Sequence, residues 1–205
     1  YIPRFRNVRK QETDFLRGYA ATFTGMRFGG GGGSPEGSFG DELKNKLMDT
    51  SAPLGPWGVG SQCMGETIPK ETNYLSLDKD KKDEWGIPLL RFSVAYDDND
   101  EKMIKDFTEQ FTEMFEKAGF IDIKATDSKQ APGLDIHEMG GVRMGKDPKT
   151  SLLNEWNQLH ACPNVFVADG ACMTSTSTQN PSLTYMAIAA RSANHAVDVL
   201  RKNEL

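Results

Sequence analysis

The clearest pattern of apolar and polar positions lies between residues 98 and 118 and is helical. Apolar side chains recur there at spacings of three and four residues, as on one face of an α-helix. They are Met103, Ile104, Phe107, Phe111, Met114, Phe115 and Ala118. Asp97, Asp98 and Asn99 offer a choice of N-cap, and Gly119 is typical of the residue that follows a helix. We therefore predict a helix that begins near residue 98 and ends before Gly119.

Strands are predicted on both sides of this helix. From Ile87 to Tyr96, apolar residues alternate with others, which favours a half-buried strand. Tyr74, Leu75 and Leu77 indicate an earlier strand that is followed by a charged turn, and residues 120–125 are a candidate for a later one. Strands and a helix in this order indicate an α+β layer.

Residues 1–28 mix polar and aromatic side chains and could supply one or two strands. The clearest break in the chain follows, because Gly29 to Gly33 are five consecutive glycines. Such a run has no preferred structure and is costly to order, so residues 29–37 are expected to form a flexible loop or linker, native or engineered. A phosphate-binding loop is rejected, because no strand-to-helix context and no Lys-Ser/Thr pair accompany the glycines. A short helix at residues 39–48 and a strand within residues 53–67 are predicted next.

After residue 130 the chain becomes loop-like and rich in glycine. Residues 164–170 indicate a short buried strand that ends in a turn. Asn180 is a candidate N-cap and Pro181 a candidate first residue of the helix that follows. This helix extends almost to the end of the chain, and its content of Ala, Ile, Met and Leu predicts burial along one flank.

Composition narrows the classes of protein to consider. The chain has 205 residues, of which 38% are hydrophobic and 26% charged, enough for one medium domain or two small ones. Its net charge of -5 argues against nucleic-acid binding, which favours basic surfaces. No apolar run approaches the roughly 20 residues that a membrane span needs. Cys63, Cys162 and Cys172 are expected to be isolated reduced thiols.

The chain begins at Tyr1, and no signal peptide is visible. We expect it to be the later part of something longer, so that any targeting region lies upstream. A periplasmic and a cytoplasmic location both remain open.

His137 is the best candidate for a base. A histidine titrates near neutrality and can accept the proton of an alcohol, and Gly140 and Gly141 allow backbone to approach a ligand closely. His160 is expected at the surface, and His195 is expected to pack within the last helix or to face solvent. No cluster of ligand residues predicts a metal site, and no G-x-S-x-G motif predicts a hydrolase.

Three other positions each have two interpretations. Asn180 could cap its helix, or it could direct its amide toward a substrate hydroxyl beside the positive end of the helix dipole. Asp169 and Gly170 could be a simple turn, which their spacing favours, or a place where backbone N–H groups meet a cofactor. Arg143 could pair with a phosphate or carboxylate, or it could be structural or solvated.

The order of three motifs resembles the closing part of a known family. The motifs are HEMGGVRMG at residues 137–145, VFVADGA at 165–171 and QNPSLTYMAIAAR at 179–191. They resemble the closing motifs of the glucose-methanol-choline (GMC) family of FAD-dependent oxidoreductases. Their residues are most similar to those of bacterial members that act on sugars and glycosides. Residues 71–100 also resemble the family's substrate-domain stretch.

The resemblance implies a fold in two parts. Residues 1–130 would be a portion of an α+β substrate domain, a mainly antiparallel sheet with helices. Residues 131–205 would be the C-terminal segment that completes an α/β FAD-binding domain. The family's G-x-G-x-x-G fingerprint is missing, so the chain alone is not expected to hold FAD tightly. The N-terminal FAD-binding portion, in the same longer chain or in a partner chain, is therefore an implied partner.

The resemblance also implies a function, which is FAD-dependent oxidation of a sugar or polyol CH–OH group by a dehydrogenase or an oxidase. His137 would be the base, Asn180 would face the substrate, and hydride would pass to flavin N5. The implied flavin neighbours are Asp169, Gly170, Ala171, Asn180, Pro181 and Ser182. The side chains of His137 and Asn180 are expected to converge on one pocket mouth. The alternative is a non-catalytic carbohydrate-binding or assembly module derived from the same fold, and the electron acceptor is left open.

Overall fold

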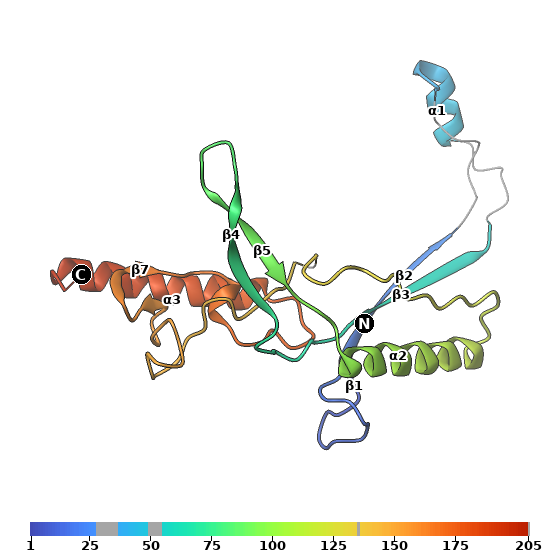
Figure 1. Cartoon of the computed structure of the whole chain (residues 1–205). Coiled ribbons are helices and arrows are strands. Elements are labelled where there is room, and N and C mark those ends of the chain that lie inside the picture. Colours follow the sequence, from blue (N-terminus) through green and yellow to red (C-terminus); the bar gives the residue numbers. More distant parts are fainter. Residues whose placement is uncertain (28–36, 49–54, 135, 205) are drawn as a thin grey trace. The chain divides into compact units, whose positions relative to one another are not determined.

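A computed structural model describes residues 1–27, 37–48, 55–134 and 136–204 of the chain (Figure 1). The predicted linker at residues 29–37 lies outside the described residues except for Gly37. Backbone contacts divide the chain into two compact units. The first unit is Tyr1–Ile2 with Ala21–Cys63, and the second is Pro3–Ala20 with Met64–Leu205. The division predicted between residues 130 and 131 stays a prediction.

The early strands follow the expectation from the sequence. Strands β1 (Ile2–Phe5), β2 (Tyr19–Arg27) and β3 (Trp57–Met64) form a three-stranded sheet in the order β1-β2-β3. Helix α1 (Gly40–Met48) confirms the short helix predicted at residues 39–48. Within the first unit, the guanidinium of Arg27 lies 5.2 Å from the centre of the Trp57 ring, and this contact joins the ends of β2 and β3.

Helix α2 (Asp98–Lys117) is the predicted central helix. Asp97 is its N-cap, and the Asp97 and Asp100 side chains form a reciprocal capping box with backbone N–H groups. Gly119 follows the helix with a φ of 81°, in the left-handed region that glycine adopts without steric cost.

One part of the buried core of the second unit lies on one face of α2, and another, with Leu153 and Cys172, lies in the C-terminal part. Tyr19 is fully buried, and its ring centre lies 5.6 Å from that of Phe107 and 6.2 Å from that of Phe111. Phe15 and Met103 are also buried. The apolar spacing in the sequence therefore identified the correct face of the helix.

Strands β4 (Tyr74–Lys82) and β5 (Pro88–Ser93) form an antiparallel hairpin (Figure 1). Leu75 pairs with Phe92 and Leu77 with Leu90, so the two predicted strands exist and pair with each other. All four side chains are more than half exposed, however. The predicted half-burial is wrong for this chain, because alternation marks a face that can be covered but does not supply the partner that covers it.

Residues 120–125 do not form the predicted strand. Asp122 has a φ of 55°, which lies in the left-handed region and interrupts an extended backbone. Phe120 instead folds back onto α2, where its ring meets the Phe115 ring edge-on at 5.1 Å. A short apolar run without a neighbouring strand has no ladder to join.

The C-terminal part contains a small hairpin and the last helix. Strands β6 (Gln158–Leu159) and β7 (Cys162–Phe166) are antiparallel, and a short 3-10 helix follows at Gly170–Cys172. Helix α3 (Ser182–Arg201) confirms the predicted last helix. The predicted burial is wrong for β7, where Val165 is exposed. In α3 one flank is covered as predicted, because Ser192 and Val199 are buried and Tyr185 is half-buried, while Leu183 and Met186 are 80% and 68% exposed.

The described elements are α+β in class, with two antiparallel hairpins and three α-helices. This confirms the coarse fold class that the sequence predicts. Within the described residues, no helix combines the length and the apolar character that crossing a bilayer requires.

Candidate active site

The segment after His137 lies against the turn that follows β7. The N–H of Val142 donates to the Ala171 carbonyl at 2.9 Å, and the N–H of Met144 donates to the Cys172 carbonyl at 3.0 Å. These two backbone hydrogen bonds hold residues 142–144 against the short 3-10 helix Gly170–Cys172. Two of the three motifs, residues 137–145 and 165–171, are therefore in direct contact.

Tyr185 brings the third motif to the same place. Its hydroxyl donates to the sulfur of Met139 at 3.6 Å. A Cβ added to Gly170 would also stand only 2.7 Å from the Tyr185 hydroxyl oxygen. Burial raises the pKa of the Tyr185 phenol, and the carboxylates of Asp169 and Glu138 raise it further. The first turn of α3 thus lies against both other motifs.

Sequence reasoning missed Tyr185. Its only local signal is that it stands four residues after Pro181, which places both on one face of the helix start. That position could not show what the phenol would touch, because Met139 lies 46 residues earlier in the chain.

Asp169 makes the turn that its spacing favours. It is the N-cap of the 3-10 helix, and its carboxylate accepts a hydrogen bond from the Ala171 N–H at 2.8 Å. Gly170 is buried, Ala171 is half-buried and Asp169 is exposed. The backbone of this turn is thus well defined beside Tyr185.

The start of α3 differs from the prediction by one residue. Pro181 is the N-cap, with a φ of -94°, and its carbonyl accepts the first helical bond from Tyr185 N at 3.0 Å. The prediction of Asn180 as N-cap and Pro181 as first helical residue is therefore wrong, because the N-cap is the residue whose carbonyl begins the ladder. The first N–H groups of a helix have no intrahelical acceptors, and no side chain of the N-cap residue accepts from them in α3.

The loop before Asn180 is tied to two distant parts of the second unit. The Gln179 side-chain amide donates to the Pro3 carbonyl at 2.5 Å. The Ser175 hydroxyl donates to the carboxylate of Glu66. Asn180 itself is exposed at the end of this loop. Its position is therefore determined by contacts on both sides, the loop before it and α3 after it.

His137 is half-buried and precedes Met139 by two residues. Asn180 precedes Tyr185 by five residues. Both candidate residues thus lie within five residues, along the chain, of a member of the Met139–Tyr185 contact. Their convergence on one pocket mouth stays a prediction.

The other two histidines are structural. The prediction of a surface position for His160 is wrong: the residue is half-buried, and its Nε2 lies 3.2 Å from both the Ser151 hydroxyl and the Gly145 carbonyl. His195 packs as expected, stacked on the Trp156 ring with centres 4.5 Å apart.

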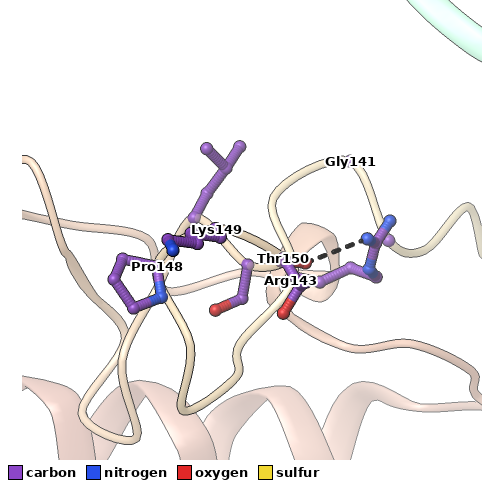
Figure 2. Close-up of a pocket in the computed structure, with 8 residues that line it drawn as sticks. Gly141, Arg143, Pro148, Lys149 and Thr150 are labelled. Atoms are coloured by element: carbon purple, nitrogen blue, oxygen red, sulfur yellow. Dashed lines mark hydrogen bonds between the residues drawn. The ribbon is translucent and has the colours of Figure 1, made fainter.

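Arg143 lies beside a hollow of about 240 Å³ that begins at Gly140 and Gly141 (Figure 2). Its guanidinium donates to the Thr150 carbonyl at 3.3 Å, so the side chain bridges the loop on which it stands. Lys149 lines the same hollow. The structural interpretation of Arg143 therefore has a contact that supports it.

The cysteines are free thiols. Burial raises the pKa of the Cys63 thiol to about 12. Burial also raises the pKa of Cys172 above its ordinary value. In the described part of the chain, no group of three or more His, Cys, Asp or Glu residues is arranged to hold a metal ion.

The chain is similar to proteins of known activity over part of their length. A 2-methyl-1,2-propanediol dehydrogenase of Mycolicibacterium austroafricanum is 31% identical over 156 residues, which cover 69% of this chain and 28% of that protein. A fructose dehydrogenase large subunit of Gluconobacter japonicus is 29% identical over 145 residues, or 71% of this chain and 26% of the relative. A gluconate 2-dehydrogenase flavoprotein of Pantoea cypripedii is 32% identical over 118 residues, or 54% and 19%.

The chain thus spans less than a third of each of these relatives. The family model described as GMC oxidoreductase matches residues 69–189, which is more than half of the chain and includes all of α2 and the Met139, Gly170 and Tyr185 junction. The chain therefore belongs to the GMC oxidoreductase family.

Proposed function

We propose that this chain is part of an enzyme that oxidises an alcohol group of a sugar or polyol with FAD. One relative is named as a dehydrogenase of a propanediol, one as a fructose dehydrogenase subunit and one as a flavoprotein. Family membership supports the reaction class. One observation supports assigning this function to particular residues. Met139, Gly170 and Tyr185 form a junction in which the three closing motifs meet.

In this proposal His137 is the base. Its imidazole takes the proton of the substrate hydroxyl, and the carboxamide of Asn180 orients the same oxygen. FAD, when bound by the complete enzyme, supplies the hydride acceptor at N5. Holding the alcohol in a reactive orientation removes part of the barrier, on the order of 7–11 kcal/mol in the best oriented systems.

The residues present suit a flavin in two respects. Gly140, next to Met139 in the chain, has a φ of 83°, in the left-handed region where any other side chain would be strained. The backbone there is not covered by a side chain of its own, so a ligand can approach it closely. The first turn of α3 has no side-chain cap, and its N–H groups and positive dipole end suit negative charge on a bound cofactor. Asp169, Gly170, Ala171, Asn180, Pro181 and Ser182 are the proposed flavin neighbours.

We assign residues 1–130 to a substrate domain and residues 131–205 to the closing segment of an FAD-binding domain. The surface of α3 supports this division, because Leu183, Met186 and Leu200 are each more than 60% exposed. Large apolar side chains on one helix indicate a face that is covered in a larger assembly. An N-terminal FAD-binding portion, in the same longer chain or in a partner chain, is the proposed cover.

The test is flavin reduction by substrate in the full-length enzyme, followed under anaerobic conditions. The variant His137→Ala is expected to lower the rate of reduction by about 100- to 10,000-fold, the usual contribution of a general base. Flavin absorbance must be retained in the variant, which shows that the cofactor site is intact. A near-normal rate in a flavin-loaded variant would refute the assignment. Full-length protein that binds sugar but shows no flavin absorbance would instead identify a binding module.

A further inference from the structure

The geometry points to Glu66 as a positioning residue for the active site, acting through Ser175 on the loop that ends at Asn180. This inference rests on the proposed function, because it assigns to Glu66 the task of holding the substrate-facing carboxamide. Glu66 follows β3 by two residues and lies 109 residues from Ser175 in the sequence. It is not among the residues that sequence reasoning selected.

The carboxylate of Glu66 is placed to receive a strong hydrogen bond. Its side chain is 10% exposed, and its Oε1 accepts the hydroxyl proton of Ser175. A hydroxyl that donates to a carboxylate forms a charge-assisted bond, stronger than one between neutral groups. Low exposure limits the competition from water, so this bond can hold a loop. The second oxygen, Oε2, lies 3.7 Å from Nε of Arg17, whose side chain is 51% exposed.

Ser175 connects the Glu66 carboxylate to the backbone of the loop. While its hydroxyl donates to Glu66, the same oxygen accepts the N–H of Ser177 at 3.0 Å. A hydroxyl has one proton and two lone pairs, so it can serve both partners at once. The carboxylate therefore also sets the direction in which the Ser175 oxygen presents its lone pairs to Ser177.

Ser177 is the residue of this loop that most needs support. Its φ of 60° lies in the left-handed region, which a non-glycine residue adopts at a cost. Such a conformation persists when surrounding contacts favour it over the alternatives. The Thr176 hydroxyl closes the following turn by donating to the Gln179 carbonyl at 2.8 Å. Asn180 comes immediately after this turn.

The sequence of contacts explains what loss of Glu66 would do. Without the carboxylate, the Ser175 hydroxyl can rotate away from Ser177, and the left-handed conformation loses a bond that favours it. The loop can then relax, and the carboxamide of Asn180 is held less well. A misplacement of about 1 Å in an active site can cost on the order of 100-fold in rate.

The test compares Glu66→Ala, Glu66→Gln and Ser175→Ala in the full-length enzyme, with anaerobic flavin reduction and steady-state kinetics as readouts. Glu66→Ala and Ser175→Ala are expected to lower kcat by about 10- to 100-fold. KM should change little, because orientation affects the transition state more than ground-state binding. Glu66→Gln should recover most of the rate, since the amide oxygen still accepts the Ser175 proton.

Two controls make the outcome decisive. Glu71→Ala removes an exposed glutamate five residues further on and should leave kcat unchanged. The double variant Glu66→Ala/Ser175→Ala should be no slower than either single variant, because both remove the same contact. Additive losses in the double variant, or a normal kcat in Ser175→Ala, would overturn the inference.

The proposed function is tested separately in the same series by His137→Ala. A collapse of flavin reduction in His137→Ala, with normal rates in both Glu66→Ala and Ser175→Ala, overturns the positioning role alone. Normal reduction in all three variants overturns the proposed function and the positioning role together. If Glu66→Ala fails to fold, Ser175→Ala and Glu66→Gln still decide, because each changes less of the buried volume.

Discussion

The hydroxyl of Tyr185, in the first turn of α3, donates to the sulfur of Met139 at 3.6 Å, although 46 residues separate them in the chain. Gly170 also packs against this hydroxyl, because a Cβ built on it would lie 2.7 Å from the same oxygen. One phenol therefore contacts the histidine-bearing segment and the turn after β7, and it belongs to the helix that follows Asn180. This contact makes three sequence motifs into one site.

The first prediction concerns Gly170. A Cβ at this position would lie 2.7 Å from the Tyr185 hydroxyl oxygen and 2.9 Å from its Cζ. We expect Gly170→Ala to lower the free energy of unfolding of the full-length protein by about 1–3 kcal/mol, the usual range for overpacking. The measurement is urea unfolding.

The control for this prediction is Gly60→Ala, because no atom lies within 4 Å of a Cβ added to Gly60. Its effect should stay within about 0.5 kcal/mol. The double variant Gly170→Ala/Tyr185→Leu should recover part of the loss, since it removes the clashing ring. An equal effect of Gly170→Ala and Gly60→Ala would contradict the packing that we describe.

The second prediction concerns the half-buried carboxylate of Asp106, which joins α2 to the N-terminal part of the second unit. Asp106 accepts the hydroxyl proton of Tyr19 at 2.6 Å and two bonds from Arg6, each at 3.0 Å. Tyr19→Phe removes one hydrogen bond to a charged group and should lower the free energy of unfolding by about 1.5–3 kcal/mol. Thermal and urea unfolding of the full-length protein provide the measurement.

Tyr74→Phe is the matched control, because Tyr74 is 54% exposed. Asp106→Ala should be more harmful than Tyr19→Phe, since it leaves both the Tyr19 hydroxyl and the Arg6 guanidinium without this acceptor. Equal stability of the Tyr19 and Tyr74 variants would show that the Tyr19–Asp106 hydrogen bond contributes nothing to the free energy of unfolding.

The third prediction concerns the thiol of Cys63. Burial raises its pKa to about 12, whereas an unfolded cysteine ionises near pH 8.5. At pH 8 the folded thiolate fraction is therefore roughly a thousandfold smaller than in the unfolded chain. Alkylation of Cys63 by iodoacetamide, followed by mass spectrometry, should be correspondingly slow until urea unfolds the protein.

The raised pKa of Cys63 also determines how its contribution to the free energy of unfolding changes with pH. Between about pH 9 and pH 12 the unfolded chain releases the Cys63 proton while the folded chain keeps it, so the contribution of this residue to stability falls as the pH rises. Cys63→Ala should flatten the decline in this range. Fast alkylation of Cys63 in the folded protein would contradict the raised pKa of this thiol.

The fourth prediction concerns the acid sensitivity of α2. Nζ of Lys70 lies 3.0 Å from the Asp97 carboxylate and, together with two backbone N–H bonds, lowers the pKa of Asp97. A lowered folded pKa means that the stabilising effect is present above the unfolded pKa, about 3.9, and is lost as the pH falls through the folded value.

Asp97→Asn should keep the helix cap but lose this pH dependence, because asparagine caps as well as aspartate and carries no charge. Asp97→Ala should be less stable than Asp97→Asn at every pH, because it removes the cap. The measurement is the urea midpoint as a function of pH between 7 and roughly 2, below the unfolded pKa. If the wild type and Asp97→Asn lose stability in parallel, the Lys70 contact does not set the pH dependence.

Local patterns predicted the helices well because a helix depends on neighbours in the chain. The apolar spacing of α2, its acidic N-cap choices and Gly119 lie within about one turn of the bonds that they affect. Burial was predicted poorly for the opposite reason. Leu77 and Leu90 pair across the β4-β5 hairpin as expected, yet their exposure depends on a cover that their own strands do not contain.

Some residues of the candidate site could likewise be predicted from the sequence and others could not. Its motifs could be read from the sequence, since His137, Asp169 and Asn180 stand in short runs with a recognisable order. Tyr185, Glu66 and Ser175 could not, because their contacts bridge 46 and 109 residues and leave no periodic signal. The start of α3 was also displaced by one residue, since the first helical carbonyl belongs to Pro181.

The amino-acid sequence by itself determined the family, the positions of the helices and the order of the three closing motifs, because these depend on residue type and short-range spacing. Only the tertiary structure decided that the Met139 sulfur, the Gly170 backbone and the Tyr185 phenol would meet, and that Glu66 would hold the loop before Asn180. Hydrogen bonds and close packing act over a few ångströms in space. Which distant residues come that close is a property of the folded chain.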